Sequence, residues 1–62
     1  MKARIVIPTY NEGENIVPLL QELLTAVPDS RILVVDDGSP DGTGKMVGEY
    51  AKRDARVSLL SR

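Results

Sequence analysis

Two polar clusters in this 62-residue chain carry the side chains that could do chemistry. The first, Pro8-Thr9-Tyr10-Asn11-Glu12, combines an aromatic ring with a carboxylate. Tyr10 could stack on a base, Glu12 could accept hydrogen bonds from ribose hydroxyls, and the N-terminus of a following helix could face phosphate. The alternative is a turn in which the proline ends a strand, Asn11 caps a helix and the glutamate favours its first turn. Taken alone, this cluster favours the turn.

The second cluster runs from Asp36 to Thr43 and reads Asp-Asp-Gly-Ser-Pro-Asp-Gly-Thr. Its two adjacent carboxylates repel each other and must stay hydrated or find hydrogen-bond donors. The alternative is structural: Asp36 or Asp37 forms an Asx turn, and Asp41 caps the next helix. This alternative explains one of the two adjacent aspartates but not the presence of both. A carboxylate at this place could instead accept from the ring N–H of a uracil or guanine. The cluster therefore predicts recognition of a base.

Apolar periodicity predicts the elements that position these clusters. β-branched residues followed by Pro8 indicate a strand at 4–8, and further apolar runs indicate strands at 31–36 and 56–60. Leucines and other apolar residues at helical spacing predict a helix at 12–26, and a weaker stripe predicts a second at 42–53. Asn11 and Glu14 have the spacing of a capping box, and Pro28 ends the first helix.

The order of these elements predicts an open α/β sheet. The run Ile32-Leu33-Val34-Val35 is apolar at successive positions, which is typical of a parallel strand covered on both faces. Strand–helix alternation implies parallel strands with right-handed crossovers. We expect the first strand in the centre, the second beside it and the third outside. Both polar clusters would then meet at the carboxyl ends of the strands, where such sheets bind ligands.

Composition excludes several classes of protein. Eight basic and nine acidic residues give a net charge of -1, which argues against a nucleic-acid-binding domain. The absence of Cys and His excludes a disulfide scaffold and a Cys/His zinc site. The apolar runs are too short for a membrane span or a signal-peptide core, so a cytoplasmic location is expected. Open sheet edges favour the first part of a longer domain over a small protein that pairs its edge with a partner.

Two stretches, Ile5–Glu12 and Val34–Thr43, resemble the start of family 2 glycosyltransferases of the GT-A fold. The ending Ser-Pro-Asp-Gly-Thr is most similar to that of polyprenyl-phosphate (dolichol-phosphate) mannosyltransferases. The resemblance covers essentially the whole chain. It implies the N-terminal β-α-β-α-β half of a GT-A (Rossmann-like) nucleotide-diphospho-sugar transferase fold, with a parallel sheet. Residues 1–62 are then the incomplete, nucleotide-binding part of a single glycosyltransferase domain.

The resemblance also implies a reaction and a set of site residues. The reaction is the inverting transfer of mannose from GDP-mannose to a polyprenyl (dolichyl) phosphate, by a protein peripheral to the cytoplasmic face of a membrane. In such enzymes the turn after the first strand and the end of the second hold the nucleotide. The matching residues here are Pro8, Tyr10, Glu12, Val35 and Asp37, with Asp36 as a secondary candidate. No catalytic residue and no metal ligand is assigned in this chain.

The metal motif of the family, Asp-x-Asp, lies after a later strand, and this chain ends before it. The divalent cation expected in the complete enzyme, Mg²⁺ or Mn²⁺, would have its ligands outside these residues, and so would the acceptor. The 62 residues alone are expected to be inactive. The alternatives are a family 2 transferase that moves glucose or builds polysaccharide, a non-catalytic nucleotide-binding fragment, and a small interaction protein.

Overall fold

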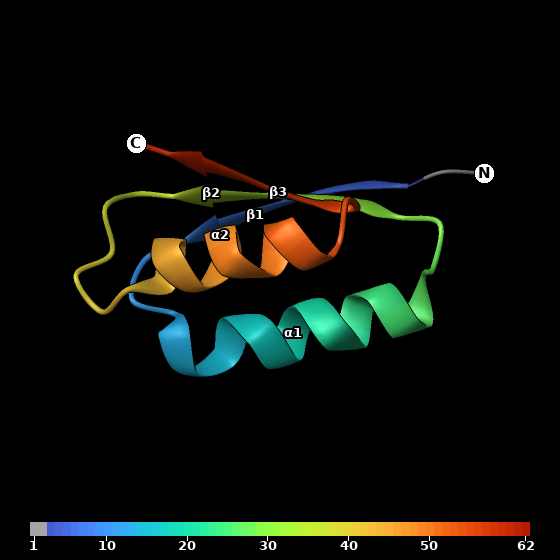
Figure 1. Cartoon of the computed structure of the whole chain (residues 1–62), viewed down its shortest axis with the longest axis horizontal. Helices are drawn as coiled ribbons and strands as arrows, with labels where there is room; N and C mark the ends of the chain where they lie inside the picture. The colour runs from blue at the N-terminus through green and yellow to red at the C-terminus, as the bar shows by residue number, and fades with distance from the viewer. Residues whose placement is uncertain (1–2) are drawn as a thin grey trace.

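The structure, a computed structural model, describes residues 3–62 as strands alternating with helices (Figure 1). The elements are β1 (Arg4–Thr9), α1 (Gly13–Ala26), β2 (Arg31–Asp36), α2 (Thr43–Arg53) and β3 (Val57–Ser61). Each bound lies within one residue of its prediction, so periodicity located every element. Neither helix of the described part is long and apolar enough to cross a membrane.

The strands form one parallel sheet in the order β1-β2-β3. The α/β fold class and the outer position of β3 are therefore confirmed. The prediction that the first strand is central is wrong for residues 3–62, because β1 pairs with β2 alone and lies at an edge. A central β1 would need a further strand on its other side, and β2 takes the central place instead.

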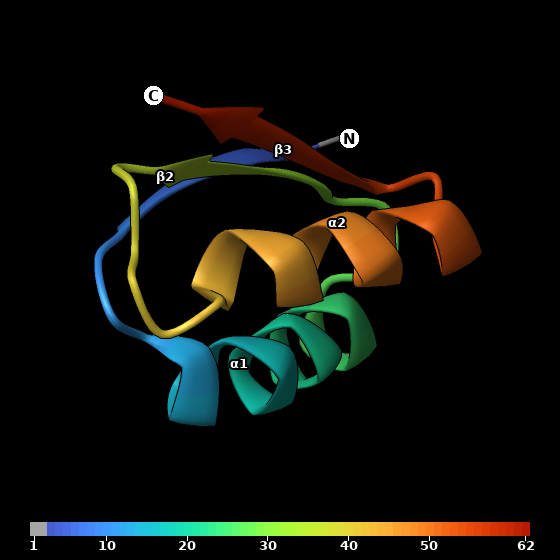
Figure 2. The same cartoon turned by 60° about the vertical axis from the view of Figure 1, so that its left-hand side comes forward.

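Both helices cover the same face of the sheet (Figures 1 and 2). Right-handed crossovers that step in one direction, from β1 to β2 to β3, place their helices on one side. The prediction that β2 is covered on both faces is therefore wrong here. Ile32 and Val34 of β2 are buried beneath the helices, whereas Val6 is 62% exposed and Leu60 is 49% exposed on the other face.

The core lies between α1, α2 and the covered face of the sheet. Helix α1 contributes Ile16, Leu20 and Leu24, which are spaced one turn apart. Val47 from α2 and Val57 from β3 complete the cluster with the buried residues of β2. This cluster fixes the position of both helices and, through them, of the loops that follow β1 and β2.

The predicted capping box at the start of α1 is wrong. The N-cap residue is Glu12, and its side chain makes no capping hydrogen bond. Asn11 has a φ of 56°, in the left-handed region that asparagine tolerates better than most residues, so it lies outside the helix. The amides at the start of α1 instead donate hydrogen bonds to the side chains of Asp41 and Thr43, which lie just before and at the start of α2.

Candidate functional site

The two polar clusters meet at the carboxyl end of the sheet, as predicted. β1 ends at Thr9 and β2 ends at Asp36, and these residues are register partners. Beyond them, the amide of Asp37 donates a hydrogen bond to the carbonyl of Thr9 at 3.2 Å. The chain then leaves the sheet in two neighbouring segments, residues 10–13 after β1 and residues 37–43 after β2, and each segment ends on the first residue of the next helix. We call them the first turn and the second loop.

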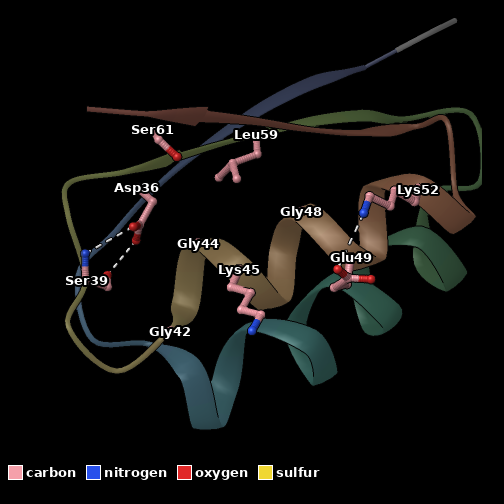
Figure 3. A pocket seen from close by; sticks show the side chains of 10 residues that line it. All are labelled: Asp36, Ser39, Gly42, Gly44, Lys45, Gly48, Glu49, Lys52, Leu59 and Ser61. Carbon is pink, nitrogen blue, oxygen red and sulfur yellow. Dashed lines mark hydrogen bonds and ion pairs between the residues drawn. The ribbon is translucent and has the colours of Figure 1, made fainter.

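Asp36 is a buried carboxylate whose oxygens bind protein donors. Its Oδ1 accepts hydrogen bonds from the hydroxyls of Thr9 (2.9 Å) and Ser39 (2.5 Å), and its Oδ2 accepts from the Ser39 amide at 3.1 Å (Figure 3). The Ser39 hydroxyl is the main reason that the pKa of Asp36 lies below its usual 3.8, even though burial opposes this. Asp36 therefore stays charged and shapes the second loop.

Asp37 has the opposite environment, although it is the next residue. Its side chain is 63% exposed, and the nearest cation is Arg62, with 3.7 Å between Nε and Oδ1. Such a solvent-exposed pair contributes little to stability and is readily exchanged for another partner. The structure thus separates the two aspartates, one of which supports the loop while the other can meet a ligand.

The other predicted site residues border the same rim. Tyr10 is 58% exposed, and Glu12 is exposed at the residue before α1. Pro8 and Val35 are register partners on the face of the sheet that the helices leave open. The carbonyl of Val35 also accepts a long hydrogen bond from the Thr9 hydroxyl, at 3.5 Å. The rim therefore offers an aromatic ring, two carboxylates and a small apolar floor.

Three side chains that sequence reasoning did not assign to the site hold the first turn. The amide of Asn11 donates to the Ser39 hydroxyl at 2.9 Å, and the amide of Glu12 donates to the Thr43 hydroxyl at 3.0 Å. The amide of Gly13 donates to Oδ2 of Asp41 at 3.0 Å. The signal that could have found these residues is their spacing, Ser-x-Asp-x-Thr, which places polar side chains at alternate positions.

Asp41 serves both helices. Its Oδ1 accepts from the amide and the hydroxyl of Thr43, the first residue of α2. The N-cap residue of α2 is Gly42, so the predicted cap at Asp41 is displaced by one residue, although its carboxylate does bind the first amide of the helix. The Oδ2 of Asp41 binds the first amide of α1. These bonds, led by the one from the Thr43 hydroxyl, lower the pKa of Asp41 below 3.8. A phosphate at the N-terminus of α1 would have to displace this carboxylate.

The acidic residues do not fit a divalent cation. Within residues 3–62, no three metal-ligating side chains gather in one place. Asp36 and Asp41 direct their oxygens to protein donors, which leaves Asp37 and Glu12 as the exposed carboxylates of the rim. A metal held by carboxylates needs several oxygen ligands.

A groove of about 510 Å³ runs between α2 and β3, next to the rim (Figure 3). Gly44 and Gly48 line one side of it, Asp36 lies at one end, and the Lys52–Glu49 ion pair (3.5 Å) lies at the other. A Cβ atom at Gly44 would lie 3.0 Å from Oδ2 of Asp36. The absence of a side chain at Gly44 therefore lets the N-terminal end of α2 approach the buried carboxylate of Asp36.

Comparison with known proteins gives the family. Residues 4–62 match the family model described as Glycosyl transferase family 2. An undecaprenyl-phosphate mannosyltransferase of Micrococcus luteus is 48% identical over the whole chain, and a polyprenol monophosphomannose synthase of Mycolicibacterium smegmatis is 49% identical over 94% of it. A dolichyl-phosphate beta-glucosyltransferase of Trichomonas vaginalis is 35% identical over 92% of the chain.

These relatives are much longer than the chain, which covers 26%, 22% and 20% of their respective lengths. An open parallel sheet with a polar rim at the carboxyl ends of its strands defines an α/β protein of the Rossmann-like class, consistent with the N-terminal half of a GT-A fold. Together with the match over residues 4–62, it confirms the resemblance read from the sequence. The chain belongs to glycosyl transferase family 2.

Proposed function

We propose that residues 1–62 are the donor-nucleotide-binding part of a single glycosyltransferase domain that transfers mannose from GDP-mannose to a polyprenyl phosphate. Two relatives support the choice of sugar and acceptor. One is named as an undecaprenyl-phosphate mannosyltransferase and the other as a polyprenol monophosphomannose synthase. In the inverting reaction, a phosphate oxygen of the lipid attacks the anomeric carbon while the bond from that carbon to GDP breaks. The acceptor is already anionic, so it needs little help from a general base.

The contrast between Asp36 and Asp37 carries this proposal. Asp36 is 4% exposed and bonded to the protein, whereas the neighbouring carboxylate projects into solvent at the carboxyl end of β2. A carboxylate there can accept from both N–H groups on the Watson–Crick edge of guanine, and such charge-assisted pairs are strong. In the proposed complex, Tyr10 stacks on the base and Glu12 binds the ribose, while Pro8 and Val35 form the apolar floor.

Titration of GDP against variants of the full-length protein tests the assignment. Asp37→Asn replaces one acceptor oxygen with an NH₂ group that faces a donor, and losing a charge-assisted bond costs about 1.5–3 kcal/mol. We therefore expect GDP to bind about 10- to 150-fold more weakly. Asp36→Asn is expected to weaken binding less and to lower stability more.

Asp29→Asn is the matched control, because Asp29 is exposed and precedes β2 at the opposite end of that strand. It should leave the dissociation constant of GDP unchanged. Circular dichroism of each variant separates loss of binding from loss of folding. If the Asp37→Asn protein binds GDP as tightly as the parent, the role of Asp37 in reading the base is wrong.

A second candidate function is transfer of glucose, because one relative at 35% identity is named as a glucosyltransferase. The donor nucleotide discriminates between mannose transfer and glucose transfer. Guanine offers the carboxylate two N–H donors, whereas uracil offers one. Consumption of GDP-mannose and UDP-glucose should be measured side by side with a polyprenyl phosphate acceptor. We expect turnover of GDP-mannose, and turnover of UDP-glucose alone would select the glucosyl alternative.

The remaining parts of the proposal concern the whole enzyme. A lipid acceptor implies work at a membrane surface, and we assign the protein to the cytoplasmic face. We also propose that transfer needs Mg²⁺ or Mn²⁺ bound by ligands outside residues 1–62, so that EDTA abolishes it and either cation restores it. The 62 residues alone are expected to yield no mannosyl lipid in the same assay, and product from the purified fragment would contradict this.

A further inference from the structure

We propose that Ser39, Asp41 and Thr43 are positioning residues, which hold the first turn in the conformation that receives the donor nucleotide. They act through backbone amides and do not themselves contact the nucleotide. The inference rests on the proposed function, because it explains how the rim residues are kept in place for a nucleotide. It extends that function to side chains of the second loop that neither the resemblance nor the comparisons assign.

The hydrogen-bond pattern is the first observation behind this proposal. Three consecutive amides of one segment, those of residues 11, 12 and 13, donate to three alternate side chains of another, at 2.9, 3.0 and 3.0 Å. The partners are separated by 28 to 31 residues in the chain. Each of these three amides is thus attached to a different point of the second loop, so neither segment can shift without the other.

The first turn depends on these bonds, because it has little support of its own. The N-cap residue of α1 makes no side-chain capping bond. The backbone of Asn11 lies in the left-handed region, with a φ of 56°, which raises the energy of an isolated turn. Amides at a helix N-terminus have no partner within the helix, so external acceptors decide their position. The second loop supplies those acceptors.

Thr43 is the central member of the set. It is fully buried, and its hydroxyl accepts from the Glu12 amide while donating to Oδ1 of Asp41. The direction of each hydrogen bond follows from the partner, since a backbone N–H can only donate and an ionised carboxylate can only accept. Its two bonds place Glu12, the proposed ribose ligand, relative to the start of α2. A substitution that removes this hydroxyl breaks both bonds at once.

The same loop connects the first turn to the base-reading carboxylate. The Ser39 hydroxyl accepts a hydrogen bond from the Asn11 amide and donates one to Asp36, the residue before Asp37. The backbone segments that carry Tyr10 and Asp37 are thereby held next to each other before a ligand arrives. A site that is already arranged for its ligand loses less conformational entropy on binding, and small displacements of the contacting groups weaken binding strongly.

Two threonine variants of the full-length protein test the proposal. Thr43→Val keeps the shape of the side chain and removes the hydroxyl, whereas Thr43→Ser keeps the hydroxyl. We expect Thr43→Val to raise both the dissociation constant of the bound nucleotide and the KM for nucleotide sugar by about tenfold. The KM for polyprenyl phosphate should stay unchanged, and Thr43→Ser should remain within about threefold of the parent. A general loss of stability would not produce this split between the two substrates.

Two further variants keep the test decisive. Thr25→Val is the matched control, because Thr25 is an exposed helical threonine whose hydroxyl bonds only within α1, to the Gln21 carbonyl at 2.8 Å. It should change neither KM. If Thr43→Val does not fold, Ser39→Ala takes its place, since it removes the hydroxyl that binds both Asn11 and Asp36 and should raise the same KM selectively.

The outcomes separate this inference from the proposed function. A parent that binds UDP in place of GDP overturns the proposed donor while leaving the positioning role to be measured with UDP. A parent that binds GDP, with Thr43→Val and Ser39→Ala binding it equally well, overturns the positioning role alone. A parent that binds neither nucleotide overturns both. An equal rise in KM for both substrates also counts against positioning and indicates a merely structural role.

Discussion

Two glycines in α2 offer a matched test of how the rim is packed. Gly44 and Gly48 lie one helical turn apart on the side of α2 that faces the groove (Figure 3). A Cβ at Gly44 would meet Oδ2 of Asp36 at 3.0 Å and its Cγ at 3.5 Å. A Cβ at Gly48 would lie 3.7 Å from Cδ2 of Leu59, an ordinary contact. The same substitution to alanine should therefore have opposite effects at the two positions.

The magnitudes follow from these contacts. Alanine in place of glycine inside a helix stabilises by about 0.5–1 kcal/mol, and Gly48→Ala should show this gain. At Gly44, the new methyl group presses on a carboxylate that is anchored by Thr9 and Ser39 and cannot simply rotate away. Overpacking of this kind costs about 1–3 kcal/mol. After the helix gain is subtracted, Gly44→Ala should lower the free energy of unfolding by about 0.5–2 kcal/mol.

Thermal and urea unfolding followed by circular dichroism would measure the difference. In the full-length protein, whose relatives are several times longer than this chain, 1 kcal/mol corresponds to a shift in Tm of about 2–4 °C, so the two variants should still be resolved. If Gly44→Ala is as stable as Gly48→Ala, Asp36 yields without cost and is not the rigid support described above. If Gly44→Ala is destabilised as expected, a third variant, Gly44→Ala with Asp36→Asn, should show whether the clash depends on the charged network.

Two further predictions concern the first turn and the opposite end of the sheet. Asn11→Val should lower the free energy of unfolding by about 1–2 kcal/mol relative to Asn11→Gly, because a β-branched residue resists a φ of 56°; equal urea midpoints would count against this. Asp54 accepts hydrogen bonds from the Arg56 side chain, which lower the pKa of the carboxyl from 3.8 to about 2. Its contribution to stability is therefore complete above 3.8 and is lost as the pH falls toward about 2. Asp54→Asn should flatten the stability profile in that range, and a profile parallel to that of the parent would refute the assignment.

The sequence predicted the elements well because apolar spacing reports them directly. It failed for features that depend on distant residues. The capping box at Asn11 and Glu14 had the correct spacing, yet the backbone of Asn11 adopts a left-handed conformation and the caps come from the second loop. Likewise, the apolar run of β2 does not reveal that both crossovers place their helices on one face.

The site was predicted in part. Two polar clusters at the ends of β1 and β2 were sufficient to predict a common rim, because parallel strands end at the same edge. The resemblance placed Asp37 ahead of Asp36, but the residues alone gave no physical reason for this order, since the difference depends on the hydroxyls of Thr9 and Ser39. The nucleotide-binding roles of the rim residues remain predictions for the titrations described above.

The capping of α1 from a distance also determines how this region opens. The start of the helix is local in sequence, but the acceptors for its first amides arrive only when β2 and the second loop are in place. Helix formation at this end therefore depends on contacts between residues that are far apart in the sequence. In the native state, release of the second loop frees the amides of Asn11, Glu12 and Gly13 together. Hydrogen exchange at these three positions should share one opening free energy, so the rim opens and closes as a single cooperative unit.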